Sequence, residues 1–303
     1  MNWNTENDFF PVIRKDRKVQ TMIQHKEDGV EYLTFHNLEQ LSGFSHLFST
    51  RIGGISNGIF SSMNLSFTRG DEKSAVLENF SRIAKILGIS PEQFVLSDQT
   101  HTDHIYVVTK EDAGNGLTKP LPYHDIDGLI TNVPGLALST FYADCVPVFL
   151  IDPVHKAIGL CHSGWKGTVL EIGLKTVRKM EQTFGSDPKD IYAAIAPSIC
   201  QDCYEVSEDV ILEFQKVFIP DAASGTDCGY PDGMEKKLYT KKENGKYQLN
   251  LWNACYYTLL KAGVSAENIE VTDICTCCNP QYLFSHRASQ GKRGNLGAFL
   301  MIK

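Results

Sequence analysis

The sequence predicts an α+β fold with mixed β-sheets. Short apolar runs typical of strands and longer amphipathic segments typical of helices are interspersed along the chain. They do not follow the regular strand–helix–strand rhythm of a doubly wound fold. The 303 residues are 42% hydrophobic and 21% charged, so the chain can bury a large core. No internal repeat or linker-like tract divides residues 1–303, and we therefore expect a single domain.

Several segments have the apolar spacing and the end residues of helices. In the first of them, Val76, Phe80 and Ile83 share one helical face, and Gly88 follows where a C-terminal cap belongs. Ser207 is a typical N-cap residue for a later segment. The expected helices span residues 71–87, 168–184, 208–218 and 250–262.

Strands are predicted where apolar and β-branched residues form short runs. The expected strands span residues 105–109, 136–141, 146–151, 157–161, 191–195, 269–272 and 296–302. Residues 220–246 are rich in Gly, Asp and Lys, which predicts a surface loop within the domain.

Charge and cysteine content narrow the classes of partner. The formal net charge is −7, so we expect neither nucleic acid nor a membrane as a partner. The first residues lack the basic and apolar regions of a secretory signal, and the nine cysteines are an odd number spread over a long chain. We therefore expect a cytoplasmic protein with reduced thiols. The sequence carries no prediction of the oligomeric state.

Three polar fragments indicate a metal centre. Gln99-Thr-His101, Ala143-Asp-Cys145 and the fragment from Cys161 to Thr168, which contains His162, supply two imidazoles and one thiolate from separate segments. Such a His/Cys/His set leaves the fourth position of tetrahedral zinc open for water or substrate, as in a catalytic site. Asp144 and Gln99 are adjacent candidates for orienting the ligands or transferring a proton. The sequence therefore favours a zinc enzyme.

Other readings of the same residues stay open. His/Cys/His is also the equatorial set of a blue-copper site, but a multicopper oxidase needs many further histidines, and this chain has nine in all. Cys145 could instead be the nucleophile of a cysteine hydrolase, with His101 or His162 as its base. A binding module without catalysis is a further alternative.

Basic residues and additional cysteines suggest further sites. Arg51, Lys166 and Arg287 lie in contexts that suit phosphate or ribose contacts, and Lys166 belongs to a strand–turn–helix junction that could face an anion. Cys200-x-x-Cys203 and Cys275-x-Cys277-Cys278 could combine into a second, structural metal site. Their spacing has no partner in a zinc-ribbon pattern, which favours buried or idle thiols.

The fragments resemble the laccase-domain family, whose members were long labelled multicopper polyphenol oxidases and later assigned as zinc-dependent purine nucleoside phosphorylases. The resemblance runs in order from about residue 48 to residue 299. It is carried above all by Ala143-Asp-Cys-Val-Pro147 and His162-Ser-Gly-Trp-Lys-Gly-Thr168. Further matching segments are Ser49-Thr-Arg-Ile-Gly-Gly-Ile-Ser56, Gln99-Thr-His101, Asp127-Gly-Leu-Ile-Thr131 and Phe284-Ser-His-Arg287.

The resemblance implies both a fold and an activity. The implied fold is one α+β domain of layered mixed sheets flanked by helices. The implied zinc ligands are His101, Cys145 and His162. The implied activities are phosphorolysis of adenosine, inosine and methylthioadenosine, plus deamination of adenosine, in which Asp144 would carry a proton. Arg51, Lys166 and Arg287 are the cations we expect to hold the phosphate.

The chain departs from the family pattern outside the ligand set. Thr102 replaces a Gly that often follows the first ligand His, and Ala288 replaces a frequent second Arg. A terminal Thr-Gly-Arg motif reads Arg293-Gly294-Asn295, so its arginine is shifted or replaced. These changes leave the metal ligands intact and affect the expected phosphate contacts.

Overall fold

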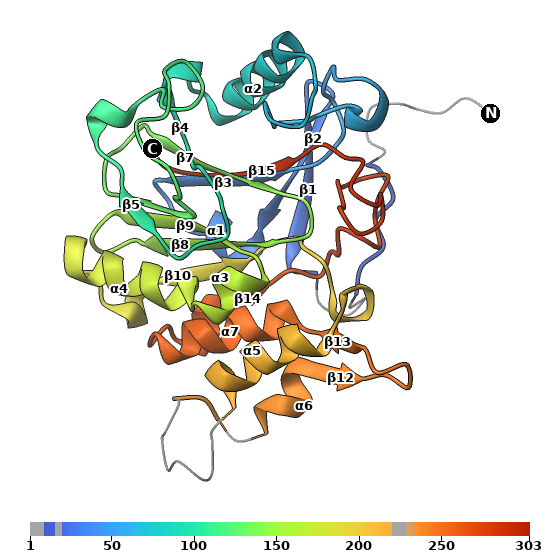
Figure 1. The fold of residues 1–303 in the computed structure, drawn as a ribbon. Helices are drawn as coiled ribbons and strands as arrows, with labels where there is room; N and C mark the ends of the chain where they lie inside the picture. Colours follow the sequence, from blue (N-terminus) through green and yellow to red (C-terminus); the bar gives the residue numbers. More distant parts are fainter. Residues whose placement is uncertain (1–8, 16–19, 220–228, 232) are drawn as a thin grey trace.

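The computed structural model describes residues 9–15, 20–219, 229–231 and 233–303. It confirms the predicted α+β class with mixed sheets (Figure 1). Within the described residues, strands form two six-stranded sheets and one three-stranded sheet. The helices are α1 (His36–Glu39), α2 (Lys73–Leu87), α3 (Trp165–Val169), α4 (Ile172–Phe184), α5 (Glu208–Phe218), α6 (Met234–Leu238) and α7 (Leu251–Lys261).

The first sheet combines the N-terminal strands with the last strand of the chain. Its order is β1 (Met22–Glu27), β2 (Val30–Phe35), β3 (Phe44–Ser49), β15 (Leu296–Ile302), β7 (Ala137–Tyr142) and β4 (Phe94–Leu96). Neighbouring strands are antiparallel except β4 and β7, which are parallel.

The second sheet contains β9 (Ala157–Ser163), the strand that carries His162. Its order is β14 (Ile269–Val271), β10 (Tyr192–Ile195), β8 (Val146–Asp152), β9, β6 (Gly128–Thr131) and β5 (Ile105–Val107). The outer pairs, β10 with β14 and β5 with β6, are parallel, whereas the inner pairs are antiparallel. The small sheet contains β11 (Glu205–Val206), β13 (Tyr247–Leu249) and β12 (Tyr239–Lys241).

The two large sheets pack face to face between layers of helices (Figure 1). Apolar side chains of the first sheet, such as Leu138 and Leu300, share one buried core cluster with Phe149 and Leu160 of the second. Helix α2 covers the outer face of the first sheet, α3, α4 and α7 cover the outer face of the second, and α5 packs against α3 on the far side of this helical layer. β8, β9 and β15 are buried along their whole length because each lies between a sheet and a helical layer.

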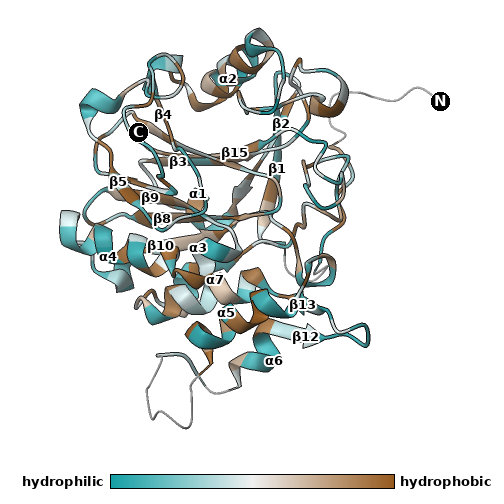
Figure 2. Cartoon of the chain, in the orientation of Figure 1, coloured by the Kyte–Doolittle hydropathy of each residue, from teal (hydrophilic) through white to brown (hydrophobic). Residues whose placement is uncertain are grey.

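The hydropathy pattern agrees with this layering. Apolar residues concentrate on the central strands, whereas polar residues face outward on the peripheral helices (Figure 2). Among the described residues, none of the helices has the length and apolar character that a bilayer span requires.

Most expected elements are confirmed, and the helix predicted over residues 208–218 has the bounds of α5. The single helix expected over residues 168–184 is wrong, because it is two helices, α3 and α4. Glu171 separates them in a left-handed conformation with φ of 57°. Its Oε1 accepts hydrogen bonds from the Tyr230 hydroxyl (2.6 Å) and the Lys261 ammonium (2.8 Å), which hold the break.

The loop expected over residues 220–246 is wrong in part. Residues 220–228 and 232 lie outside the described residues, but α6 and β12 occupy much of the remainder. Leu238 and Met234 are buried there, so this segment forms part of a core cluster. The strands β1 to β3 were missed because alternating polar residues, such as His25 and Glu31, interrupt their apolar pattern.

Candidate metal centre

The structure brings His101, Cys145 and His162 together from three segments. His101 lies in the loop between β4 and β5, and Cys145 lies in the turn between β7 and β8. His162 lies near the end of β9, where Pro147 of β8 is its partner in the antiparallel ladder. This register places the turn that carries Cys145 beside the His162 side chain.

The three side chains converge closely enough to share one ion. Their candidate ligand atoms all lie within 4.8 Å of one another, and Cys145 Sγ is 3.9 Å from His101 Nε2. The two imidazole rings are 4.8 Å apart at an interplanar angle of 81°, so they meet edge to face. Bond lengths of about 2.0–2.3 Å place neighbouring ligand atoms about 3.3–3.8 Å apart around tetrahedral zinc. The set therefore fits zinc with small side-chain movements.

Asp127 organises two of the three ligands. Its carboxylate Oδ1 is 2.6 Å from His162 Nδ1, which directs Nε2 of that ring toward the other ligands. The same carboxylate accepts hydrogen bonds from the backbone amides of Thr100, His101 and Thr102 at 2.9–3.1 Å. Asp127 is fully buried, immediately before β6. The sequence offers one signal for this role, an Asp directly before an apolar strand within a family-like segment, but its burial and its contact with His162 depend on the tertiary structure.

Local backbone geometry fixes the positions of the ligands. His101 has φ of 69° and Asp144 has φ of 89°, which are rare values for residues other than Gly. A Cβ added to Gly164 would lie 2.9 Å from His101 Cδ2 and 3.1 Å from Cys145 Sγ. Gly164 therefore leaves the space in which the two ligands meet.

The charges within the set favour a thiolate. Burial alone would raise the pKa of Cys145, but the imidazoles of His162 and His101 lower it to about 6. Burial alone would lower the pKa of His162, whereas Cys145 and Asp127 raise it to about 9. Because the thiolate is the form that ligates metals and attacks electrophiles, Cys145 is ready for either chemistry near neutral pH.

Asp144 and Gln99 are both tied to neighbouring segments. Asp144 Oδ1 accepts from the Thr276 hydroxyl (2.6 Å), and its Oδ2 accepts from the backbone amide of Arg287 (2.7 Å). The Gln99 side chain exchanges two hydrogen bonds with the backbone of Phe141. These contacts place both residues beside the ligands and anchor the surrounding loops.

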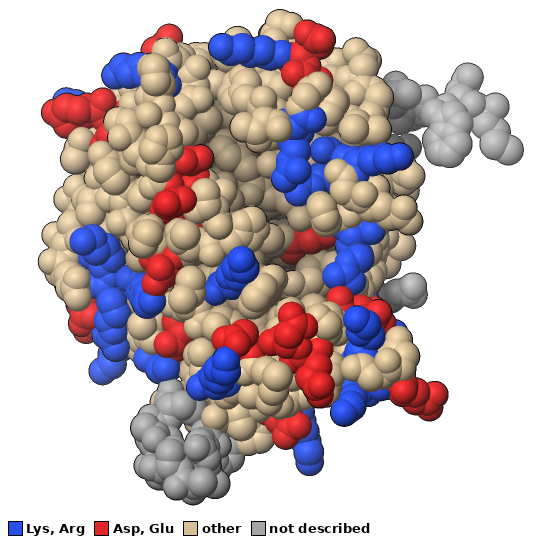
Figure 3. Space-filling view, in the orientation of Figure 1, with Lys and Arg blue, Asp and Glu red and all other residues tan. Residues whose placement is uncertain are grey.

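The three candidate ligands open into a pocket of about 320 Å³. Loops that follow Met63, β4, β7 and Arg293 contribute its walls, and Phe67, Phe141 and Leu121 supply apolar surface. Arg69 and Arg293 supply the cations. The face drawn in Figure 3 is hollowed below the α2 layer, and basic and acidic side chains lie on opposite margins of the hollow.

The cations expected from the sequence lie outside that lining. The Arg51 guanidinium donates to the carbonyls of Ser61 (2.8 Å) and Pro280 (2.6 Å). The Arg287 guanidinium donates to backbone carbonyls of the segment before β11 and within it. Lys166 is exposed and lies over the Trp165 ring. Arg69 and Arg293 were not selected from the sequence, because only the fold places them beside the ligands.

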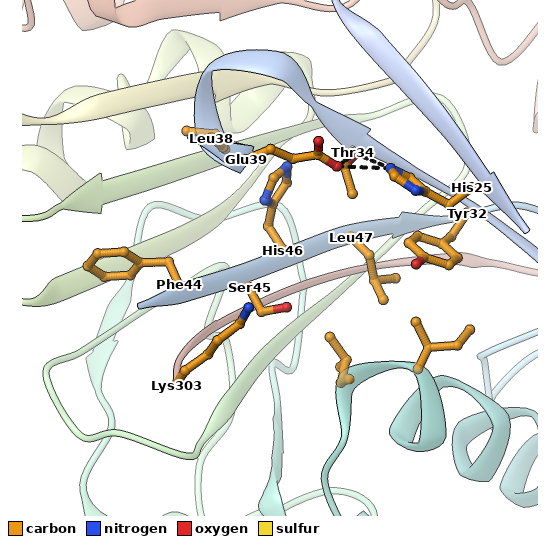
Figure 4. A pocket seen from close by; sticks show the side chains of 12 residues that line it. His25, Tyr32, Thr34, Leu38, Glu39, Phe44, Ser45, His46, Leu47 and Lys303 are labelled. Atoms are coloured by element: carbon orange, nitrogen blue, oxygen red, sulfur yellow. Dashed lines mark hydrogen bonds and ion pairs between the residues drawn. The ribbon is translucent and has the colours of Figure 1, made fainter. Parts of the chain in front are cut away.

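A second pocket, of about 260 Å³, lies against β1 to β3 and also contains two histidines (Figure 4). His25 Nε2 is 2.7 Å from the Thr34 hydroxyl and 2.9 Å from Glu39. His46 Nε2 accepts a hydrogen bond from the backbone amide of Phe35 at 2.8 Å. Both rings are therefore engaged with protein partners, and the pocket offers no group comparable to the His/Cys/His set within the described residues.

Comparisons with known proteins agree with the geometry. A family model described as "Multi-copper polyphenol oxidoreductase laccase" matches residues 45–303. The purine nucleoside phosphorylase YlmD of Bacillus subtilis is 33% identical over 88% of this chain and 90% of its own length. A purine nucleoside phosphorylase of Bacteroides thetaiotaomicron is 34% identical over 89% of this chain and 96% of its own. The crystal structure of YlmD from Geobacillus stearothermophilus superposes with a TM-score of 0.83 at 31% identity, covering 94% of this chain and all of the other.

The fold, the converging ligands and these similarities lead to one assignment. The chain belongs to the laccase-domain family.

Proposed function

We propose that this chain is a zinc-dependent purine nucleoside phosphorylase that acts on adenosine, inosine and methylthioadenosine and also deaminates adenosine. The convergence of His101, Cys145 and His162 at a pocket of about 320 Å³ carries the proposal. The names of the similar phosphorylases supply the substrate class. A zinc ion held by the three ligands would supply Lewis-acid chemistry in the pocket.

The remaining residues would bind and orient the substrates. Phosphorolysis requires a phosphate to reach C1′ of the ribose while the purine leaves. Arg69 and Arg293 line the pocket, and Arg293 Nε is a buried donor without a hydrogen-bond partner. We assign phosphate binding to these two arginines, because a guanidinium matches the oxygen spacing of a phosphate. Phe67 and Phe141 would contact the flat purine ring.

The contacts of the other expected residues suit supporting roles. Arg51 and Arg287 would brace loops through their carbonyl partners, and exposed Lys166 would contribute little. Both oxygens of Asp144 already accept hydrogen bonds, which favours positioning of the Cys145 turn over proton transfer.

A cysteine hydrolase is the second candidate function, and one observation favours it. Asp127, His162 and Cys145 form a carboxylate–imidazole–thiolate series, with the 2.6 Å contact orienting the base. Such a series activates a cysteine nucleophile without a metal. The two candidates therefore differ in whether the thiolate binds zinc or attacks the substrate.

Purified chain incubated with adenosine and phosphate should release adenine and ribose 1-phosphate, and inosine should accumulate without phosphate. Chelation should abolish both activities, and added zinc should restore them. Cys145→Ala should have neither activity. If neither adenine nor inosine forms, the proposed function is wrong. If brief alkylation of the thiols abolishes the activity and chelation does not, the cysteine hydrolase is supported instead. If the purified chain contains copper and oxidises phenols, an oxidase is supported.

A further inference from the structure

A second cluster of metal-ligating groups lies apart from the proposed catalytic centre. Cys200, Cys203, Cys275 and Cys278 come from two segments that are about 70 residues apart in sequence, and their sulfur atoms all lie within 4.8 Å of one another. Each segment has the spacing Cys-x-x-Cys. Within the described residues, the cluster and the His/Cys/His set are the groups of three or more side chains able to hold an ion.

From this geometry we propose that the four cysteines form a structural, tetrathiolate zinc site. Four sulfur atoms at about 2.3 Å from a tetrahedral ion lie about 3.8 Å from one another. The Cys203 and Cys278 sulfurs are 3.5 Å apart, close to that value and much longer than the roughly 2.05 Å of a disulfide. All four cysteines are free thiols.

The fold presents the sulfurs from two matched turns. The backbone amide of Cys203 donates to the Cys200 carbonyl at 3.1 Å in the first turn, and the Asn279 side chain donates to the Cys275 carbonyl at 2.8 Å in the second. The backbone amide of Cys200 donates to the Cys275 sulfur at 3.2 Å and thereby links the two turns. Amides directed at sulfur stabilise thiolates and orient metal ligands. The two turns are joined by the parallel bridge between Ser198 and Cys275.

Burial and charge also suit a closed structural site. Cys200 and Cys275 are buried, whereas Cys203 and Cys278 are partly exposed, so the ion would have an entry path at the surface. Four thiolates around a divalent ion leave a charge of about −2. The Lys15 ammonium donates to Asp202 at 2.9 Å and interacts electrostatically with Cys200, which places a compensating cation beside the cluster.

The cluster has a structural consequence for the catalytic centre. Thr276, between the paired cysteines, donates to the carboxylate of Asp144, and the Ile199 amide donates to the Asp144 carbonyl (3.0 Å). Asp144 directly precedes the ligand Cys145. An ion joining the two turns would therefore hold the residues that position Cys145, without contacting substrate.

Zinc content of the reduced, full-length chain tests the proposal. Saturation with zinc followed by removal of the unbound metal should leave about two ions per chain. Cys145→Ala should retain about one, and cobalt bound to that variant should show the intense thiolate charge-transfer absorption of a tetrathiolate site. Cys203→Ser combined with Cys278→Ser should lose one ion and that absorption. Cys277→Ser is the matched control, since Cys277 is adjacent but outside the set.

The outcomes separate this site from the proposed function. A single ion in the wild type that Cys145→Ala loses, or disulfide-linked cysteines and no metal in Cys145→Ala under reducing conditions, would overturn the tetrathiolate site. Unchanged metal content in the Cys203→Ser/Cys278→Ser double variant would also overturn it. Because Cys145→Ala is scored by metal content, the result stands whether or not the chain phosphorolyses nucleosides.

Discussion

Asp127 Oδ1 lies 2.6 Å from His162 Nδ1, and both side chains are buried. This contact fixes the ring so that Nε2 faces His101 and Cys145. The same carboxylate also holds the loop that carries His101 through the backbone amides of Thr100 and Thr102. One buried acid thus sets the orientation of two candidate ligands from different segments.

Replacing this acid should weaken metal binding while the ligands remain. Asp127→Asn loses the charge that polarises His162, and an amide nitrogen cannot accept the backbone hydrogen bonds of the loop. Loss of such an outer partner typically lowers metal affinity by about 10- to 100-fold. Competition with a chromophoric chelator measures the dissociation constant.

Asp152→Asn is the matched control for this prediction. Asp152 is also fully buried and contacts a histidine, His155, at 2.8 Å in the turn between β8 and β9. That pair lies outside the candidate metal groups. Equal zinc affinity of the Asp127→Asn variant and the wild type would show that Asp127 does not orient a metal ligand.

Gly164→Ala should perturb the centre sterically. The φ of Gly164 is −71°, so alanine is allowed by the backbone. Its Cβ would nevertheless lie 2.9 Å from His101 Cδ2 and would displace one of the ligands. We expect about tenfold weaker zinc binding and lower activity, since a shift of one ligand costs more than 1 kcal/mol.

Gly173→Ala provides the comparison. The added methyl in α4 would meet Leu259 at 3.7 Å, an ordinary contact, and alanine favours a helix by about 1 kcal/mol. That variant should bind zinc as the wild type does and unfold at the same or a higher temperature. Wild-type zinc affinity in Gly164→Ala would contradict the steric prediction.

Replacing either pocket arginine, in Arg69→Ala or Arg293→Ala, should raise the KM for phosphate by about 10- to 100-fold. This factor corresponds to the free energy of one hydrogen bond between charged groups, about 1.5–3 kcal/mol. Lys166→Ala should leave it unchanged, because Lys166 is exposed and outside the pocket lining. Initial rates at varied phosphate and saturating inosine measure the difference. A larger effect of Lys166→Ala than of either arginine would return phosphate binding to the residue expected from the sequence.

Sequence reasoning selected the three candidate ligands because each belongs to a distinctive polar motif next to an apolar strand, and the structure brings them together. It could not identify contacts that depend on tertiary structure. The break at Glu171 is held by Tyr230 and Lys261, which lie 59 and 90 residues further along the chain. Arg293 seemed only a departure from a family motif, whereas the fold places it in the pocket wall.

The same limit applies to the cysteines. Each Cys-x-x-Cys pair is visible in the sequence, but only the parallel bridge between Ser198 and Cys275 aligns the two turns. Edge strands such as β1 were missed because half-exposed polar residues weaken their apolar alternation.

Buried His46 should make the fold sensitive to mild acid. Burial, with smaller contributions from His25 and Lys303, lowers the pKa of His46 to about 3. The unfolded chain, with a pKa near 6.5, therefore binds a proton that the folded chain excludes between about pH 6.5 and pH 3. Within that window His46 should reduce the free energy of unfolding by about 1.4 kcal/mol for each unit that the pH falls.

His46→Gln removes this titration and can keep a hydrogen-bond acceptor for the Phe35 amide, which His46 Nε2 binds at 2.8 Å. Urea unfolding at pH 7 and pH 5 should show that the variant loses about 2 kcal/mol less stability than the wild type over this interval. His36→Gln, at an exposed position, should follow the wild type. The comparison isolates the contribution of His46 to the pH dependence of stability, because the carboxylates contribute equally to that dependence in the wild type and in both variants. Parallel pH dependences of His46→Gln and the wild type would mean that His46 accepts a proton in the folded state.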